Sequence, residues 1–127
     1  MATAAVTVTA TTQKTWNDGQ RIHAVGTIAI GASPGTYQNL ANGGMVMNFQ
    51  AAKLPVQQIP DYVKIDGIAG YIYAWDPSIG TTAATPAFGI FESSGSTGAM
   101  TELSNGATIP SGVSGDTITF HAIFKKY

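Results

Sequence analysis

The stretch Ile59-Pro-Asp-Tyr-Val-Lys-Ile-Asp-Gly-Ile-Ala-Gly-Tyr-Ile-Tyr-Ala-Trp-Asp-Pro77 carries the clearest structural signal in this 127-residue chain. Side chains on a strand point alternately to its two faces, so residues of one parity share a surface. The odd positions from Val63 to Trp75 are apolar, aromatic or glycine, whereas the even positions are polar at first and apolar later. This pattern predicts the middle of a β-sheet that a second layer covers.

Two structures fit this stretch. Asp66-Gly67 between alternating apolar residues is a short-range hairpin signal. The odd-position face nevertheless continues unbroken through that pair, which favours one long strand bent by a bulge at Gly67 and Gly70.

The same alternation recurs along the chain. It predicts strands at 21–30, 87–92 and 116–124, separated by turn signals such as Asn105-Gly106. The residues expected to face inward are Ile22, Ala24, Gly26, Ile28, Ile30, Met45, Met47, Phe49, Phe88, Ile90, Ile118, Phe120, Ala122 and Phe124. The only helix candidate, 50–54, is too short to stand on propensity. About eight strands predict an all-β fold, an antiparallel β-sandwich with the jelly roll as its leading version.

The composition narrows the classes of function. Only 10% of residues are charged and the formal net charge is −1, which argues against a nucleic-acid partner. There is no cysteine, hence no disulfide framework and no thiolate metal site. Residues 1–14 are expected to form an N-terminal strand or extended arm, not a signal peptide, and residues 15–127 a single sandwich domain. No stretch approaches transmembrane length, so no membrane partner is expected.

No catalytic or metal-binding constellation is recognisable. Gly31-Ala-Ser33-Pro-Gly35 matches the Gly-x-Ser-x-Gly elbow of hydrolases, but Pro34 has no N–H for an oxyanion hole. His23 and His121 lack nearby carboxylates, which favours a hydrogen-bonded or interface role over zinc. The carboxylates fall mostly at turns, where they satisfy backbone amides. We therefore expect no enzyme activity, no metal and no cofactor.

Tyr71, Tyr73 and Trp75 form the one aromatic row. A buried row is the widest part of a core or of a subunit interface, and this interpretation is favoured. An exposed row is a stacking platform for sugar rings. The alternative function is therefore a carbohydrate-binding β-sandwich module.

The combination of Asp61-Tyr-Val-Lys-Ile-Asp-Gly67, Gly70-Tyr-Ile-Tyr-Ala-Trp-Asp-Pro77 and the terminal Gly115-Asp-Thr-Ile-Thr-Phe-His-Ala-Ile-Phe-Lys-Lys-Tyr127 resembles small virion structural proteins of tailed bacteriophages. The resemblance is to the jelly-roll cement, or decoration, proteins of the head. It implies a non-enzymatic dimer or trimer, made in the host cytoplasm and bound on the outer surface of the capsid where major capsid protein subunits meet. A head-fibre or tail component is the neighbouring possibility.

The N-terminal segment is the candidate interface. Val6 and Val8 alternate with threonines and can add a strand to an open sheet of a neighbour, while the threonines face solvent. The candidate residues of a subunit or capsid interface are Val6, Val8 and Trp16.

Overall fold

Two antiparallel sheets make up the protein, of which the computed structural model describes residues 3–10, 16–17, 19–32, 35–51, 56–93 and 98–125. The larger sheet has the order β1-β3-β9-β5, and β2 follows β1 along the same edge of β3. Its five strands are β1 (Val6–Ala10), β2 (Trp16–Asn17), β3 (Arg21–Ile30), β5 (Tyr62–Asp66) and β9 (Ile118–Lys125).

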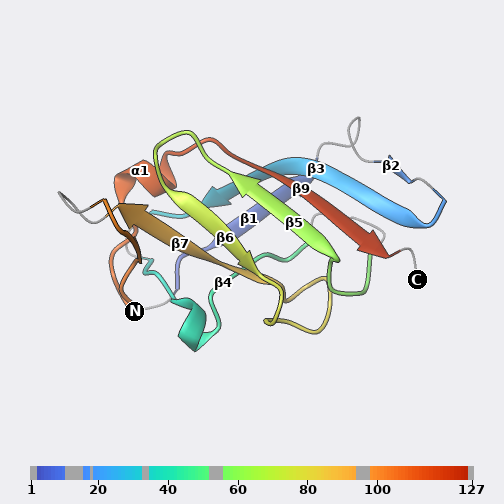
Figure 1. Cartoon of the computed structure of the whole chain (residues 1–127), viewed down its shortest axis with the longest axis horizontal. Helices are drawn as coiled ribbons and strands as arrows, with labels where there is room; N and C mark the ends of the chain where they lie inside the picture. Colours follow the sequence, from blue (N-terminus) through green and yellow to red (C-terminus); the bar gives the residue numbers. More distant parts are fainter. Residues whose placement is uncertain are drawn as a thin grey trace.

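The smaller sheet has the order β4-β7-β6, and β8 pairs with β7 on the side away from β6. Its four strands are β4 (Met45–Val46), β6 (Ile72–Asp76), β7 (Ala87–Ser93) and β8 (Met100–Glu102). The expected all-β antiparallel sandwich is confirmed, whereas the jelly-roll version stays a prediction. Figure 1 shows β5 beside β6 although the two strands belong to different sheets.

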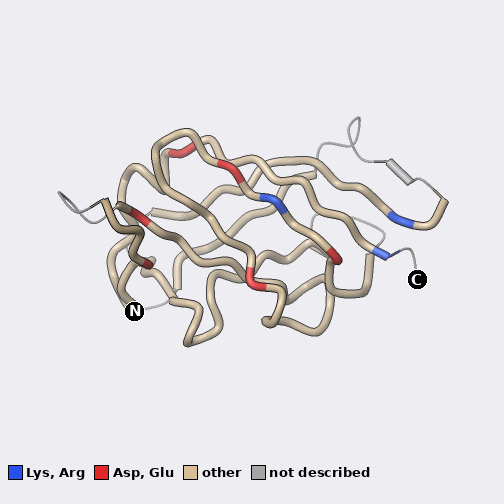
Figure 2. The backbone as a smooth tube through the Cα atoms, viewed as in Figure 1, with Lys and Arg blue, Asp and Glu red and all other residues tan. Residues whose placement is uncertain are grey.

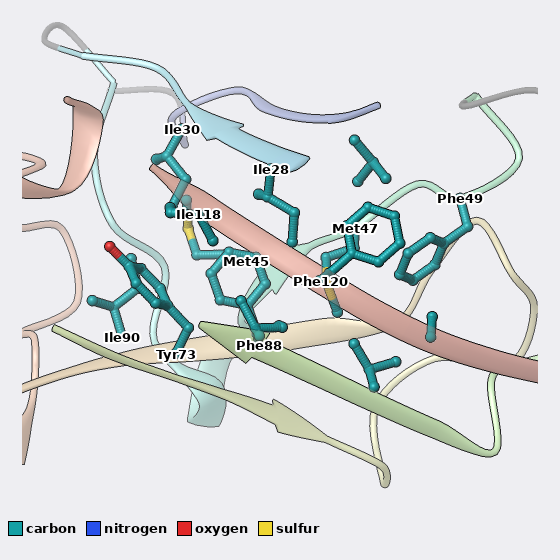
Figure 3. Close-up of a cluster of buried hydrophobic side chains, with 14 of the residues drawn as sticks. Ile28, Ile30, Met45, Met47, Phe49, Tyr73, Phe88, Ile90, Ile118 and Phe120 are labelled. Carbon is teal, nitrogen blue, oxygen red and sulfur yellow. The ribbon is translucent and has the colours of Figure 1, made fainter. Parts of the chain in front are cut away.

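Apolar side chains from both sheets fill the space between them. The inward-facing residues expected from strand alternation are all buried, and Ala24, Phe88 and Phe124 are completely so. Phe49 packs edge-on against two rings of β9, at centroid distances of 5.4 Å from Phe120 and 5.1 Å from Phe124. Figure 3 shows this cluster, in which Met45 and Met47 pack among aromatic side chains.

The expectation for the stretch 59–77 is corrected in two respects. The stretch forms neither a hairpin nor one bent strand, because β5 and β6 lie in different sheets and the chain crosses between them at 67–71. Each strand also lies at the edge of its sheet, and the centre of the larger sheet is formed by β3 and β9. The odd positions nevertheless face the core in both strands, because the inner faces of the two sheets look toward each other.

In the part of the chain that the structure describes, the helical elements are single turns: the 3₁₀ turn η2 (Leu40–Asn42) and the α-helical turn α1 (Ser111–Ser114). Of the helix candidate 50–54, residues 52–54 lie outside the described part, and 50–51 form a turn. Within the described residues, no helix is long and apolar enough to cross a membrane.

Candidate interaction surface

The direction of the hydrogen bonds around β1 shows which of its backbone groups are paired. The Gly31 amide donates to the Ala5 carbonyl over 2.8 Å, so Ala5 points toward β3. The Ala4 amide donates in the opposite direction, to the Thr36 carbonyl over 2.9 Å. Backbone groups of an antiparallel strand alternate in this way, so odd residues of β1 bond to β3 and even residues point to its outer edge.

Beyond Ala4 the outer edge of β1 is open. Among the described residues no strand pairs with this edge, since β1 is the terminal strand of the sheet path. The N–H and C=O groups of Val6, Val8 and Ala10 therefore face outward without a strand partner. Such a row of groups is a template for pairing with another chain.

The other long edges carry charges that β1 lacks. Lys64 and Asp66 form an exposed ion pair on β5, with the ammonium nitrogen 3.6 Å from the carboxylate oxygen. β6 ends at Asp76. Figure 2 shows basic and acidic positions along β5 and at its start. By contrast β1 contains no Lys, Asp, Glu or Pro, the residues with which proteins usually protect an edge.

Threonines cover the outer face of the larger sheet next to this edge. Thr7 and Thr9 are exposed, and Thr9 is in register with Thr27 of β3, which is in register with Thr119 of β9. A row of hydroxyl and methyl groups thus crosses three strands. On β5 the row continues into Asp66, which is in register with Thr119, so the part of this face without charged side chains is the part over β1 and the adjoining end of β3.

The opposite end of the same face holds the two histidines. Nδ1 of His23 lies 3.5 Å from Nε2 of His121, across β3 and β9. On the other side of β9, Lys64 of β5 is in register with His121, which places a cationic residue beside the two histidines. Within the described part of the chain, no three His, Cys, Asp or Glu residues gather into a group that could hold a metal ion.

The structure places the predicted interface residues in the sheet of their own chain. Val8 is buried and Val6 is partly buried against the core, because β1 pairs with β3 over its full length. Of the two forms expected for this segment, a strand or an extended arm, residues 6–10 form the strand, and the interface role of Val6, Val8 and Trp16 stays a prediction. Trp16 lies on β2, opposite His23, and its side chain is outside the described part.

The aromatic row belongs to the core. Tyr73 is 4% exposed, while Tyr71 and Trp75 are partly buried and pack against the same cluster. The indole Nε1 of Trp75 is buried without an acceptor among the described residues. An exposed stacking platform for sugar rings is thus not formed by these three side chains.

The carboxylate of Asp116, for which the sequence indicated no long-range role, holds distant segments together. Asp116 Oδ1 accepts from the amides of Ile68 and Ala69 at 2.9 and 3.1 Å, and Oδ2 accepts from the Tyr73 hydroxyl at 2.7 Å. Burial opposes ionisation of Asp116, but the hydrogen bonds from Tyr73 and the amides outweigh it and lower the carboxyl pKa. No sequence pattern predicts the hydrogen bond between Ile68 and Asp116, which are 48 residues apart in the chain.

A second tyrosine–carboxylate pair lies on the other side of the core. The Tyr37 hydroxyl donates to Glu102 Oε2 over 2.5 Å and accepts from the Ile90 amide over 2.9 Å. The Leu40 amide also donates to Glu102, over 2.8 Å. Burial, followed by the hydrogen bond to Glu102, raises the pKa of Tyr37 well above its usual range. Both tyrosine–carboxylate pairs thus hold segments together that are far apart in the sequence.

A polar hollow opens beside Tyr37, with a volume of about 360 Å³. Its lining is uncharged and consists of Thr3, Thr36, Tyr37, Gln38, Asn42, Asn105 and Gly106. Two of the lining side chains bond to each other, since Thr3 Oγ1 donates to Gln38 Oε1 over 3.0 Å. The hollow contains no acid–base pair. Ser33 and Pro34, the centre of the hydrolase-like pattern, lie outside the described residues.

The most distinctive surface is therefore the uncharged outer edge of β1 together with the threonine row beside it. Comparison of the chain with protein-family models, with curated proteins and with solved structures found no match.

Proposed function

We propose that this protein is a non-enzymatic structural component of a virion, a cement protein that binds the assembled lattice of a major capsid protein and stabilises the head. One observation carries the proposal: the sandwich presents a strand edge, β1, that contains no charged residue and no proline, beside exposed threonines of β1 and β3. Soluble proteins that act alone normally protect such an edge. The resemblance described above supplies the identity of the partner.

The physical basis of the activity is linkage. A protein that binds the assembled shell, and not its dissociated subunits, shifts the equilibrium toward the shell. Many weak contacts on one particle add up through multivalency, so no single contact has to be strong. The jelly-roll form is part of this proposal, and the pairing of the early strand β3 with the last described strand β9 supports it.

The carbohydrate-binding alternative loses its main support. That alternative needs exposed rings, whereas Tyr73 is buried and Tyr71 and Trp75 pack against the core. A glycan array with the wild-type protein is expected to be blank. Strong glycan binding that Trp75→Ala abolishes without lowering the melting temperature would restore the alternative.

Co-sedimentation with particles of the virus that carries the gene tests the proposal. We expect the protein to co-sediment, to saturate, and to raise the temperature at which the particles release their nucleic acid. Thr119→Lys places a charge in the threonine row and is expected to weaken binding, whereas Thr81→Lys, in an exposed loop, is the matched control. Particles that neither bind the wild-type protein nor gain stability from it would refute the proposal.

A further inference from the structure

We propose that two copies of this chain join edge to edge through β1, about a two-fold axis that passes beside Val8. This inference rests on the proposed function, because the cement proteins that the chain resembles are dimers or trimers; it gives the edge of β1 to a second copy and leaves the threonine face beside it for the shell. It assigns a dimer in which the larger sheets of both copies become one continuous sheet. The four strands on the path β1-β3-β9-β5 of each copy then give a sheet eight strands wide.

In one register of such a pair, every backbone N–H and C=O group on the open edge of β1 finds a hydrogen-bond partner. With Val8 opposite the Val8 of the second copy, Val6 lies opposite Ala10. These are the residues whose backbone groups point to the open edge. Each copy contributes three N–H and three C=O groups, so the two copies form six hydrogen bonds and leave none of these groups unpaired.

Other registers satisfy the edge less well. A slip by two residues leaves the backbone groups of Val6 or of Ala10 beyond the end of the partner's open segment. A slip by one residue places outward-pointing groups opposite groups that already bond to β3, and it also reverses the side-chain faces. In the direction of the N-terminus the edge is closed, because the Ala4 amide bonds to Thr36.

The side chains of β1 suit the same symmetry. The sequence Val6-Thr-Val-Thr-Ala10 is nearly symmetric about Val8, so inward-facing apolar residues meet apolar residues. On the outer face Thr7 lies opposite Thr9 of the second copy, and Thr–Thr pairs across strands are favourable. Val6 is only partly buried in one copy, and in the dimer Ala10 of the second copy lies beside it. No charge lies between residues 1 and 13, so no like charges meet at the axis.

Charge substitutions on the exposed threonines test the register without touching the core. In the variant Thr7→Lys/Thr9→Lys, like charges face each other across the axis. In its matched control, Thr7→Lys/Thr9→Glu, opposite charges face each other. We expect the first variant to weaken dimerisation by about tenfold or more and the second to dimerise at least as well as the wild type, as measured by sedimentation equilibrium. Equal affinities for both variants would overturn the inference.

Cross-linking gives a second, register-specific test, because the chain contains no cysteine. Opposed residues of a non-hydrogen-bonded pair have Cα atoms about 4.5 Å apart, within the range that a disulfide spans. An oxidised mixture of Thr7→Cys with Thr9→Cys protein is therefore expected to form a covalent heterodimer. Either variant alone is expected to stay uncoupled, because like positions are offset by about 7–8 Å. Coupling of each variant with itself, or none in the mixture, would overturn the register.

Failure of this inference and failure of the proposed function give different results. A protein that is monomeric at every concentration but still co-sediments with particles keeps the function and loses the dimer. A protein that cross-links as expected but never binds particles keeps the dimer and loses the function.

Discussion

Asp116 joins parts of the chain that are far apart in sequence. Its carboxylate receives the amides of Ile68 and Ala69, at the crossing between the sheets, and the hydroxyl of Tyr73 on β6. Hydrogen bonds to a charged group stabilise more than neutral ones, about 1.5–3 kcal/mol each. The place where the chain leaves one sheet for the other is thus fixed by one side chain.

Gly67 is expected to tolerate no larger residue at this place. A Cβ there would lie 2.2 Å from Asp116 Oδ2 and 2.6 Å from Tyr73 Cε2, so Gly67→Ala must displace the hydrogen bond between those two side chains. We expect a loss of about 1–3 kcal/mol in the free energy of unfolding, measured by urea titration. Gly31→Ala is the control, because its nearest atom is at an ordinary 3.5 Å. Equal costs for the two variants would contradict this account.

Trp75 allows a second comparison within one strand. Its ring packs against the core, so Trp75→Ala is expected to cost about 3 kcal/mol, the lower end of the range for large aromatic residues, because the side chain is only partly buried. Ile72→Ala on the same strand is the control, since Ile72 is 51% exposed and its truncation opens no cavity. A melting temperature that Trp75→Ala leaves unchanged would contradict burial of the row.

Hydrogen exchange at β1 should alternate along the strand. In the monomer the amides of Thr7 and Thr9 bond to β3 and are expected to exchange slowly, whereas those of Val6 and Val8 face outward and exchange quickly. Strand β9 is the internal control, because β3 and β5 flank it and residues of both parities are protected. Two-dimensional NMR in dilute solution measures both, and uniform protection in β1 would contradict the assignment of its open edge.

Strand alternation predicted which elements form more reliably than how they are connected. The bounds of β3 and the buried face of β9 follow directly from the spacing of Ile, Ala and Phe residues. The same rule failed for 59–77, because alternation reports which side chains face inward and not which sheet a strand joins. The pairing of β1 with its own sheet and the reach of Asp116 depend on distant segments, which no local pattern in one sequence contains.

The whole molecule should lose stability in alkaline solution through its buried tyrosines. Burial raises the pKa of Tyr37 and of Tyr73 above the value near 10 of an exposed phenol, so the unfolded chain releases these protons at lower pH than the folded one. Stability is therefore fully present below about pH 10 and declines as the pH rises further. Tyr37→Phe should flatten this decline, measured as melting temperature against pH. An unchanged slope would contradict the role of this phenol.

Acid should lower the stability of the folded protein through Asp116, whose folded pKa is shifted in the opposite direction to that of the tyrosines. The folded pKa of this carboxyl is lowered, so its contribution to stability is present above the unfolded value near 4 and is lost as the pH falls through the folded pKa. Asp116→Asn keeps the size of the side chain and removes this titration. We expect it to lower stability at pH 7 but to reduce the further loss in acid. A parallel acid decline in both proteins would assign the effect to other groups.

The central position of β9 also has a consequence for synthesis on the ribosome. His23 and His121 are diagonal neighbours across β3 and β9, yet they are 98 residues apart in the chain. Ribosomes add about 5–20 residues per second, so β9 is translated on the order of ten seconds after β3, and β3 lacks this neighbour during that time. Nascent chains on adjacent ribosomes thus expose an incomplete sheet at the same time. The yield of correctly folded protein is expected to fall when many ribosomes translate one message closely spaced, and to recover when initiation is made less frequent.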